Sequence, residues 1–423
     1  MSVLVDQDSR NKTVALSTAT NVVCMGMAGV ASMLAARLLG PQGRGQFAAI
    51  VVWASLASTL GDLGISQSCS YYIARHRREA GAIAGTAIAL NLACAAVLLA
   101  LLQLFAGRIL GNEVAGSARF YLFSVPVSMT VSSLTNMMLG LGYFGRFNLI
   151  KTVQAAAYVA GFGSAWAKGP AQVGGALAGI LFFQSAGGLI ALYCAATVIR
   201  LETWRVSVAM ARELLSYGVR TYAGNLCWLA NGRLDQALLV WFAPMRELGI
   251  YAVAVSYSGL LFGVAGAVAT AAFSRAARAA SGMARRQELT RGLGLLAVLT
   301  LPLATGMALL ARFAITTVYG VAFSDACQPA CILLLGGLFL GANYVASNCL
   351  RADGRPGAPV VAEAGGLIIT VLALPFVLPR WGITGAAWVS VTSYAATAAG
   401  LAVLWMLHDR RTARERHSPL EAS

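Results

Sequence analysis

The chain has 423 residues, of which 58% are hydrophobic and 11% are charged, and its formal net charge is +15. Soluble domains carry about 25% charged residues, so this composition excludes a soluble globular protein and indicates a polytopic membrane protein. The length accommodates about twelve spans joined by short loops, which leaves no room for a soluble domain of ordinary size.

Apolar segments follow one another along the chain, and each is predicted to be a transmembrane helix. The first follows a polar N-terminus and is too long for the apolar part of a cleavable signal peptide, so we expect it to be retained. The twelve predicted helices are residues 13–39, 46–73, 82–107, 117–141, 150–165, 174–199, 214–242, 249–274, 292–310, 326–350, 358–378 and 384–407.

Basic residues are distributed unevenly over the loops between these helices. Lys and Arg number 21 in one set of alternate loops and 8 in the opposite set, and the remaining two lie inside the predicted helix 214–242. The positive-inside rule therefore places both termini in the cytoplasm. The clusters 75–78 and 285–286 are interpreted as topology signals and lipid headgroup contacts. Because the basic residues follow the loops, the positive charge does not indicate nucleic-acid binding.

The second half of the chain resembles the first half. Asn21 aligns with Asn225 at a shift of 204 residues, and the turn 141–146 aligns with 350–355 at a shift of 209 residues. A third match, at a shift of 210 residues, joins two glycine-containing segments. Matches in the same order at nearly constant shifts indicate an internal duplication.

We therefore predict an all-α membrane fold of two lobes. Residues 1–205 are expected to form an N-terminal six-helix lobe, and residues 206–423 a C-terminal six-helix lobe with a short cytoplasmic tail. Because each lobe has an even number of helices, both lobes enter the membrane from the same side. A pseudo-two-fold axis along the membrane normal then relates them, and transporters built in this way bind their substrate between the halves.

The predicted helix 214–242 carries charges that a bilayer disfavours. Arg220, Arg233 and Asp235 lie within it, with Asn225 between the arginines. Intramembrane charges usually face a bundle interior or a water-filled cavity. Arginine suits phosphate, because its planar guanidinium donates two parallel hydrogen bonds and stays charged. One interpretation is that Arg220 and Arg233 bind an anionic headgroup in a central cavity; the other is an interhelical ion pair that holds the lobes together.

Two further carboxylates, Asp62 and Glu363, are predicted inside helices and lie beside glycines. Together with Asp235 they are candidates for charge partners of the arginines or for a site of H⁺ or Na⁺ coupling. The alternative for Asp62 is a carboxylate that satisfies backbone donors at a helix break, and the alternative for Glu363 is a packing role. Asn21 matches Asn225 of the repeat, so both are expected to face the same substrate cavity.

Several chemical signatures are missing from the sequence. It contains no GxxxxGK[ST] phosphate loop, no HExxH motif and no cluster of Cys and His with metal-ligand spacing. We therefore expect no ATP hydrolysis, no metal or other cofactor and no enzymatic activity, and driving energy from an ion gradient or from downstream consumption of the product. The eight cysteines lie in apolar segments and are interpreted as buried structural residues.

Short motifs are spread over most of the chain. They are RLLGPQGRGQF at 37–47, DLGI at 62–65, YIAR at 72–75, RLD at 233–235, GIY at 249–251 and RADGRP at 351–356. Each resembles a signature of the bacterial polysaccharide-unit flippases, which serve O-antigen, capsule or exopolysaccharide synthesis. These flippases belong to the multidrug/oligosaccharidyl-lipid/polysaccharide exporter superfamily.

The resemblance implies a transporter of the bacterial inner membrane with two lobes and alternating access. It implies a substrate of undecaprenyl-pyrophosphate carrying an oligosaccharide, with the polysaccharide polymerase and export machinery as partners. The family's cavity arginines have no fixed positions, so assigning Arg220 and Arg233 to the cavity rests on their place in an apolar helix.

Two other functions stay open at this point. The first is a cation-coupled exporter of small drugs on the same fold, whose site would be expected to be acidic and aromatic, so the two arginines weigh against it. The second is a membrane enzyme of glycan assembly, such as a polymerase. The short loops predicted on the outside weigh against this enzyme.

Overall fold

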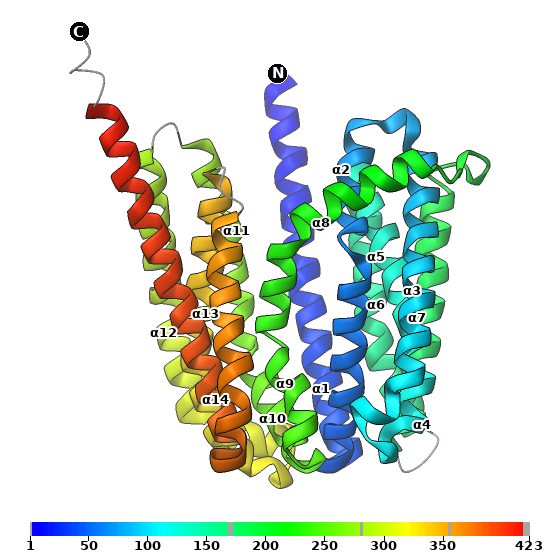
Figure 1. The fold of residues 1–423 in the computed structure, drawn as a ribbon, viewed down its shortest axis with the longest axis vertical. Coiled ribbons are helices and arrows are strands. Elements are labelled where there is room, and N and C mark those ends of the chain that lie inside the picture. The colour runs from blue at the N-terminus through cyan, green and yellow to red at the C-terminus, as the bar shows by residue number, and fades with distance from the viewer. Residues whose placement is uncertain (1, 168–171, 280–281, 354–356, 418–423) are drawn as a thin grey trace. The chain divides into compact units, whose positions relative to one another are not determined.

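The computed structural model describes residues 2–167, 172–279, 282–353 and 357–417, and the regular elements in these ranges are all helices (Figure 1). The α-helices are α1 (Ser2–Asp62), α2 (Ile65–Arg75), α3 (Ala80–Leu110), α4 (Asn112–Tyr121), α5 (Ser124–Leu141), α6 (Phe144–Trp166), α7 (Val173–Ala196), α8 (Val208–Asn231), α9 (Leu234–Phe242), α10 (Met245–Ser258), α11 (Leu260–Arg278), α12 (Gly282–Val318), α13 (Cys327–Ala352) and α14 (Gly357–His417). Short 3₁₀ helices cover Arg77–Glu79, Leu201–Thr203 and Val321–Ala326.

The predicted all-α polytopic membrane fold is confirmed. Within the described residues, eight helical stretches are long and apolar enough to cross a membrane. Two of them cover two predicted spans each, because α1 and α14 continue through a kink. The kinks lie at Gly40, with φ 64°, and at Gly382, with φ 53°. Glycine adopts a positive φ without the steric cost that a side chain adds, so both positions reverse the chain between adjacent spans.

Two other predicted helices are interrupted inside the span. The segment 46–73 breaks after Asp62, where Leu63 has φ 47° and Gly64 has φ 77°. The segment 214–242 breaks between Asn231, the last residue of α8, and Leu234, the first residue of α9. Both breaks place a carboxylate, Asp62 or Asp235, within one residue of a helix end. Polar backbone and side-chain groups are therefore concentrated at these two points.

The chain folds into two compact units. The first comprises Met1–Leu226 and Pro244–Gly249, and the second comprises Cys227–Ala243 and Ile250–Ser423. The division falls inside α8, whereas the lobe boundary expected from the repeat lies before that helix, and the repeat-based lobes stay a prediction.

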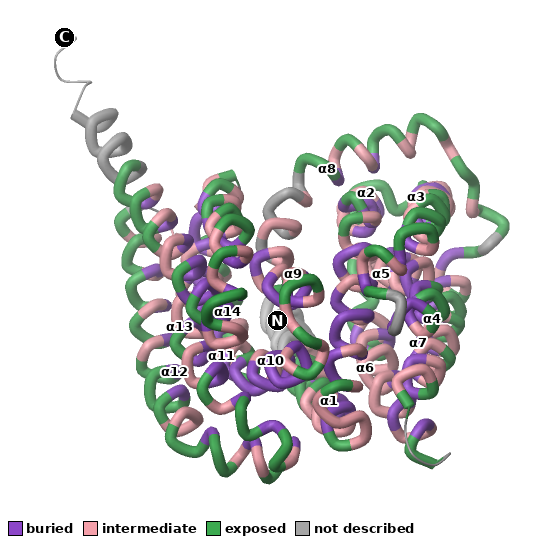
Figure 2. Tube along the Cα trace, turned by 60° about the horizontal axis from the view of Figure 1, so that its bottom comes forward, coloured by how far each residue is buried: buried purple, intermediate pink, exposed green. Residues whose placement is uncertain are grey.

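Each unit has its own apolar core. In the first unit, buried side chains from α2, α3, α5, α7 and α8 pack together, including Ile83 and Leu134. In the second unit the core comes from α11, α12, α13 and α14, including Val345 and Leu401. Much of the outer surface of the helices is apolar and exposed, as lipid-facing surface would be, and α12 is an example (Figure 2). By contrast, α10 is buried along most of its length (Figure 2).

Candidate functional site

The break between α8 and α9 creates a buried polar site in the second unit. Asp235 lies in the first turn of α9 and is 3% exposed. Its Oδ1 atom accepts a hydrogen bond from the backbone N–H of Gln236 at 2.7 Å. The N-terminus of a helix favours a negative side chain, because the first N–H groups have no partner within the helix. The helix break therefore holds one oxygen of Asp235.

The second oxygen of Asp235 is held by two other helices. The hydroxyl of Tyr251, on α10, donates to Oδ2 at 2.6 Å, and the hydroxyl of Ser390, on α14, donates to the same atom at 3.1 Å. Tyr251 and Ser390 are buried as well. A buried carboxylate is costly unless hydrogen bonds or a counter-charge stabilise it, and here the stabilising groups are neutral donors.

A second set of contacts is centred on Asn231, the last residue of α8. Its Nδ2 atom donates to Oε2 of Glu363 at 3.0 Å, and its Oδ1 atom accepts from Ser393 at 3.0 Å. The Ser393 hydroxyl also lies 2.7 Å from the carbonyl oxygen of Gly366. Asn231 and Glu363 are 2% and 4% exposed. This set joins α8 to two segments of α14 and brings Glu363 to the same helix break as Asp235.

Gly366 fits between these polar groups because it has no side chain. A Cβ atom built on it would lie 2.2 Å from Oγ1 of Thr397 and 3.0 Å from Nδ2 of Asn231. Its neighbour Gly365 has no heavy atom within 4 Å of the same position. The close approach of the two segments of α14 at this level therefore depends on the glycine at 366.

The two arginines predicted for the substrate cavity have a different environment. Arg220 on α8 and Arg233 at the start of α9 are both exposed. Within the described residues, neither guanidinium forms an ion pair or hydrogen bond with Asp62, Asp235 or Glu363. The oxygens of these three carboxylates accept from neutral donors instead. Arg233 interacts with Asp235 electrostatically, without a hydrogen bond or ion pair between the two in the described residues.

Asp62, at the other helix break, is the centre of a buried polar cluster in the first unit. Ser66 donates to its Oδ1 atom through a short hydrogen bond, and Asn91 on α3 donates to the same atom at 3.3 Å. Asn91 also donates to Ser133 of α5 at 2.6 Å. Asp62 is 6% exposed. The cluster holds α1, α2, α3 and α5 together through a carboxylate that has neutral partners.

The remaining predicted site residues are Asn21 and Asn225. The side chain of Asn225 lies outside the described residues, as do 354–356 of the RADGRP motif. Asn21 is on α1, and its Oδ1 atom accepts a hydrogen bond from Nζ of Lys151 at 2.7 Å. Lys151 lies in the first turn of the predicted helix 150–165. The helix that carries it, α6, begins at Phe144, so Lys151 lies about two turns inside the helix.

The hydrogen-bond partners of Asp235 and Asn231 were not predicted from the sequence. Ser390 lies 155 residues from Asp235 and Ser393 lies 162 residues from Asn231, whereas Tyr251 lies on the next helix, 16 residues after Asp235. Two signals were available in the sequence: Tyr251 belongs to the GIY motif at 249–251, and Ser390 and Ser393 are three residues apart and therefore on one helix face. Within the described residues, no three His, Cys, Asp or Glu side chains form a group that could hold a metal ion, and the eight cysteines are free thiols.

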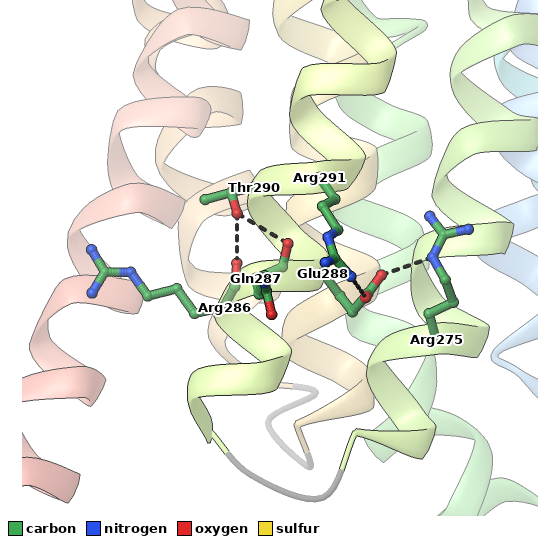
Figure 3. A network of polar contacts seen from close by, with 6 residues as sticks. All are labelled: Arg275, Arg286, Gln287, Glu288, Thr290 and Arg291. Carbon is green, nitrogen blue, oxygen red and sulfur yellow. Dashed lines mark hydrogen bonds and ion pairs between the residues drawn. The ribbon is translucent and has the colours of Figure 1, made fainter.

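The basic residues between α11 and α12 form a separate polar network (Figure 3). Arg275 on α11 and Arg291 on α12 reach the same carboxylate, that of Glu288, at 2.8 and 3.0 Å. Arg286 points away from this carboxylate (Figure 3). Arg285 forms an ion pair with Asp353 at the end of α13. These contacts stabilise the ends of helices in the predicted cytoplasmic loops, and they lie apart from the buried carboxylates.

Comparison with known sequences gives two matches. The model of the family described as polysaccharide biosynthesis protein matches residues 11–277. An uncharacterized membrane protein of Methanocaldococcus jannaschii is 26% identical over 190 residues. This match covers 44% of the chain and only 37% of the length of the curated relative.

Several solved structures of transporters have the same fold. The lipid II flippase MurJ, in an inward closed conformation, superposes with a TM-score of 0.76 at 14% identity, over 92% of this chain and 86% of MurJ. An inward-facing multidrug resistance transporter of the MATE family, in the MOP superfamily, gives 0.71 at 15% identity, over 95% and 96% of the two chains. A MOP superfamily transporter from Pyrococcus furiosus gives 0.62 at 14% identity, over 96% and 97%. At these identities the likeness establishes the fold.

Proposed function

The chain belongs to the polysaccharide biosynthesis protein family, and from this premise we propose that it is a flippase for lipid-linked oligosaccharide. Its substrate is an undecaprenyl-pyrophosphate-linked repeat unit, which it moves from the cytoplasmic to the periplasmic leaflet by alternating access. It acts in the inner membrane, with both termini in the cytoplasm. The repeat unit is then consumed by the polymerase and export machinery of a surface polysaccharide such as O-antigen, capsule or exopolysaccharide.

One observation supports an anionic group in the proposed substrate. Arg220 and Arg233 are exposed, and both belong to the predicted transmembrane segment 214–242. The buried carboxylates that would neutralise them accept hydrogen bonds from other groups, with Tyr251 and Ser390 on Asp235 as the clearest case. Two guanidinium groups that keep their charge suit a pyrophosphate, which presents several oxygens to planar donors. The arginines are therefore the proposed contacts for the pyrophosphate, with Asn225 and Asn21 beside the sugar.

The buried carboxylates supply the proposed coupling. Asp235 and Glu363 are held by neutral donors in the second unit, and Asp62 is held in the same way in the first unit. A carboxylate in a low-dielectric interior gains stability when it binds a proton or a monovalent cation. Uptake of H⁺ or Na⁺ at Asp235 and Glu363 would change the charge at the break between α8 and α9. The ion gradient would then bias the conformation of the transporter.

The test is lipid extraction and mass spectrometry of a strain that lacks the gene. If undecaprenyl-pyrophosphate repeat units accumulate unpolymerised and are inaccessible from outside, flipping is the missing step. A normal lipid-linked pool with intact surface glycan contradicts the proposal, once redundant flippases have been deleted. A gain of drug sensitivity in that strain would instead favour a cation-coupled drug exporter. Accumulation of single repeat units already exposed on the outside would favour a polymerase.

A further inference from the structure

A polar seam runs between α1 and α6 in the first unit. Lys151 Nζ donates to Oδ1 of Asn21 at 2.7 Å, and Asn148 Nδ2 lies 3.3 Å from the hydroxyl of Ser17. Asn148 and Lys151 are three residues apart and Ser17 and Asn21 four apart, so each pair occupies one helix face. The two contacts therefore lie one turn apart along the same line. We call these four residues the α1–α6 seam.

Lys151 is the charged member of the seam. It lies about two turns inside α6, and its nearest partners are a neutral amide oxygen and the ring of Phe147, whose centroid is 5.3 Å away. Within the described residues, no carboxylate forms an ion pair with it. Lys151 is half-buried, and taking an ammonium group out of water is costly unless a counter-charge or a ligand pairs with it. The hydrogen bond to Asn21 satisfies one of its three donors and leaves its charge unbalanced.

Asn148 supplies a second, independent sign of a ligand. Its side chain is 4% exposed, yet its Oδ1 atom has no hydrogen-bond partner within the described structure. Most buried polar atoms in native proteins have a partner, and an orphan acceptor costs free energy. The Nδ2 atom of the same amide reaches Ser17, so the amide faces α1. A hydroxyl group entering the seam would satisfy the orphan oxygen.

We propose that the α1–α6 seam binds the sugar–phosphate part of the transported lipid, and this inference rests on the function proposed above. A phosphate oxygen accepts from Nζ of Lys151, while a sugar hydroxyl donates to Oδ1 of Asn148. Asn21 positions the ammonium group, since its hydrogen bond to Nζ directs Lys151 toward α1. The seam thus recognises a ligand that combines an anionic group with a hydroxyl about one helical turn away, that is, about 5 Å.

The experiment measures binding of three soluble probes to the purified full-length protein in lipid nanodiscs. The probes are glucose 1-phosphate, inorganic phosphate and glucose, and their dissociation constants are determined by calorimetry. The seam variants are Lys151→Met, Lys151→Arg and Asn148→Leu. Two controls match them: Arg108→Met removes a cation that lies 5.9 Å from the ring of Phe105, and Asn136→Leu removes an amide that bonds a carbonyl of its own helix.

The wild-type protein is expected to bind glucose 1-phosphate more tightly than phosphate and to bind glucose most weakly. Lys151→Met should weaken the binding of both phosphate-containing probes at least tenfold, and Lys151→Arg should keep their dissociation constants within about threefold of the wild type. Asn148→Leu should bind phosphate normally and lose the advantage of glucose 1-phosphate, because the hydroxyl acceptor is gone. The two controls should bind as the wild type does.

The proposal that the α1–α6 seam binds the sugar–phosphate is contradicted if Lys151→Met binds both phosphate-containing probes normally. It is also contradicted if these probes fail to bind the wild-type protein. These outcomes are separate from the test of the proposed function. If the deleted strain accumulates lipid-linked units but Lys151→Met binds normally, the seam fails and the flippase stands. If the lipid-linked pool of the deleted strain is normal but Lys151 is required for binding, the flippase proposal fails and the anion site stands.

Discussion

The hydroxyl of Tyr251 donates a hydrogen bond to Oδ2 of Asp235 at 2.6 Å, and the two side chains are 0% and 3% exposed. The pair joins α9 to α10 within the second unit. A hydrogen bond to a charged acceptor is shorter and stronger than one between neutral groups. This bond therefore contributes to the stability of the helix break.

Tyr251→Phe should lower the stability of the second unit. The change keeps the aromatic ring in its buried position and removes only the hydroxyl, which leaves Asp235 with one donor fewer. The expected cost is about 1–3 kcal/mol in the free energy of unfolding, seen as a lower midpoint of thermal unfolding in detergent. The matched control is Tyr143→Phe, because Tyr143 is 48% exposed. Equal midpoints for Tyr251→Phe and the wild type would contradict the proposed contribution.

Asp235→Asn and Glu363→Gln should uncouple transport from the ion gradient. Each amide has nearly the shape of the carboxylate and cannot take up a proton at working pH or balance a bound Na⁺. Flipping of a fluorescent lipid-linked oligosaccharide in proteoliposomes is measured with an imposed pH gradient and, separately, with an imposed Na⁺ gradient. The wild type should respond to one of them and the variants to neither. A variant that keeps the wild-type response removes its residue from the coupling site.

The fold was predictable because long apolar runs separated by basic loops indicate transmembrane helices without any knowledge of tertiary contacts. The membrane class and the all-helical architecture follow from composition and from run length. The breaks were harder to foresee. A helix break at Asp62 was only one of the interpretations that the sequence left open, because the interruption depends on Leu63 adopting φ 47°, a conformation that leucine rarely adopts. The break after Asn231 contains the glycine at 232, and a single glycine is a weak signal of a break in a membrane helix.

The site was predictable only in part. Asp62, Asp235 and Glu363 stand out in the sequence because charged residues are rare in apolar helices. Their partners do not, because serine and tyrosine are common in such helices, and only tertiary packing brings Ser390 to Asp235. Lys151 lies in the first turn of the predicted helix 150–165, whereas α6 begins at Phe144, because a helix end cannot be located closely from sequence. The earlier start places Lys151 about two turns inside the helix.

Arg233→Ala should abolish export while leaving the protein folded. The side chain is exposed and has no described ion-pair partner, so its removal costs little stability, whereas a lost guanidinium–phosphate contact costs about 1.5–3 kcal/mol of binding. Export of surface polysaccharide in a complemented deletion strain should therefore fall at least tenfold. Arg233→Lys should recover only part of the loss, since lysine cannot donate two parallel hydrogen bonds. Arg312→Ala, an exposed arginine outside the proposed site, is the control; unchanged export with Arg233→Ala would remove that residue from the substrate site.

Glu288→Gln should have a smaller effect on stability than Asp353→Asn. Glu288 bonds two arginines whose side chains are 45% and 61% exposed, and such surface pairs contribute about 0–1 kcal/mol. The Asp353 side chain is only 5% exposed and pairs with Arg285, so losing its charge leaves a partly buried arginine without its counter-charge. Unfolding midpoints of the two variants at low and high salt give the comparison. A larger loss for Glu288→Gln would reverse the expected order.

Gly366→Ala should disrupt the second unit, while Gly365→Ala should be tolerated. The added methyl group at 366 would lie 2.2 Å from the hydroxyl of Thr397, which is buried, and 3.0 Å from the amide of Asn231. The two segments of α14 must then separate, or Asn231 must give up its bond to Glu363. Overpacking of this kind costs about 1–3 kcal/mol. At 365 the methyl group meets no atom within 4 Å, and alanine favours the helix by about 1 kcal/mol.

The variants should therefore differ in the sign of their change in unfolding midpoint, and Gly366→Ala should also reduce export because Asn231 and Glu363 are displaced. If both variants unfold at the same midpoint, the close approach of the two segments of α14 does not contribute to stability.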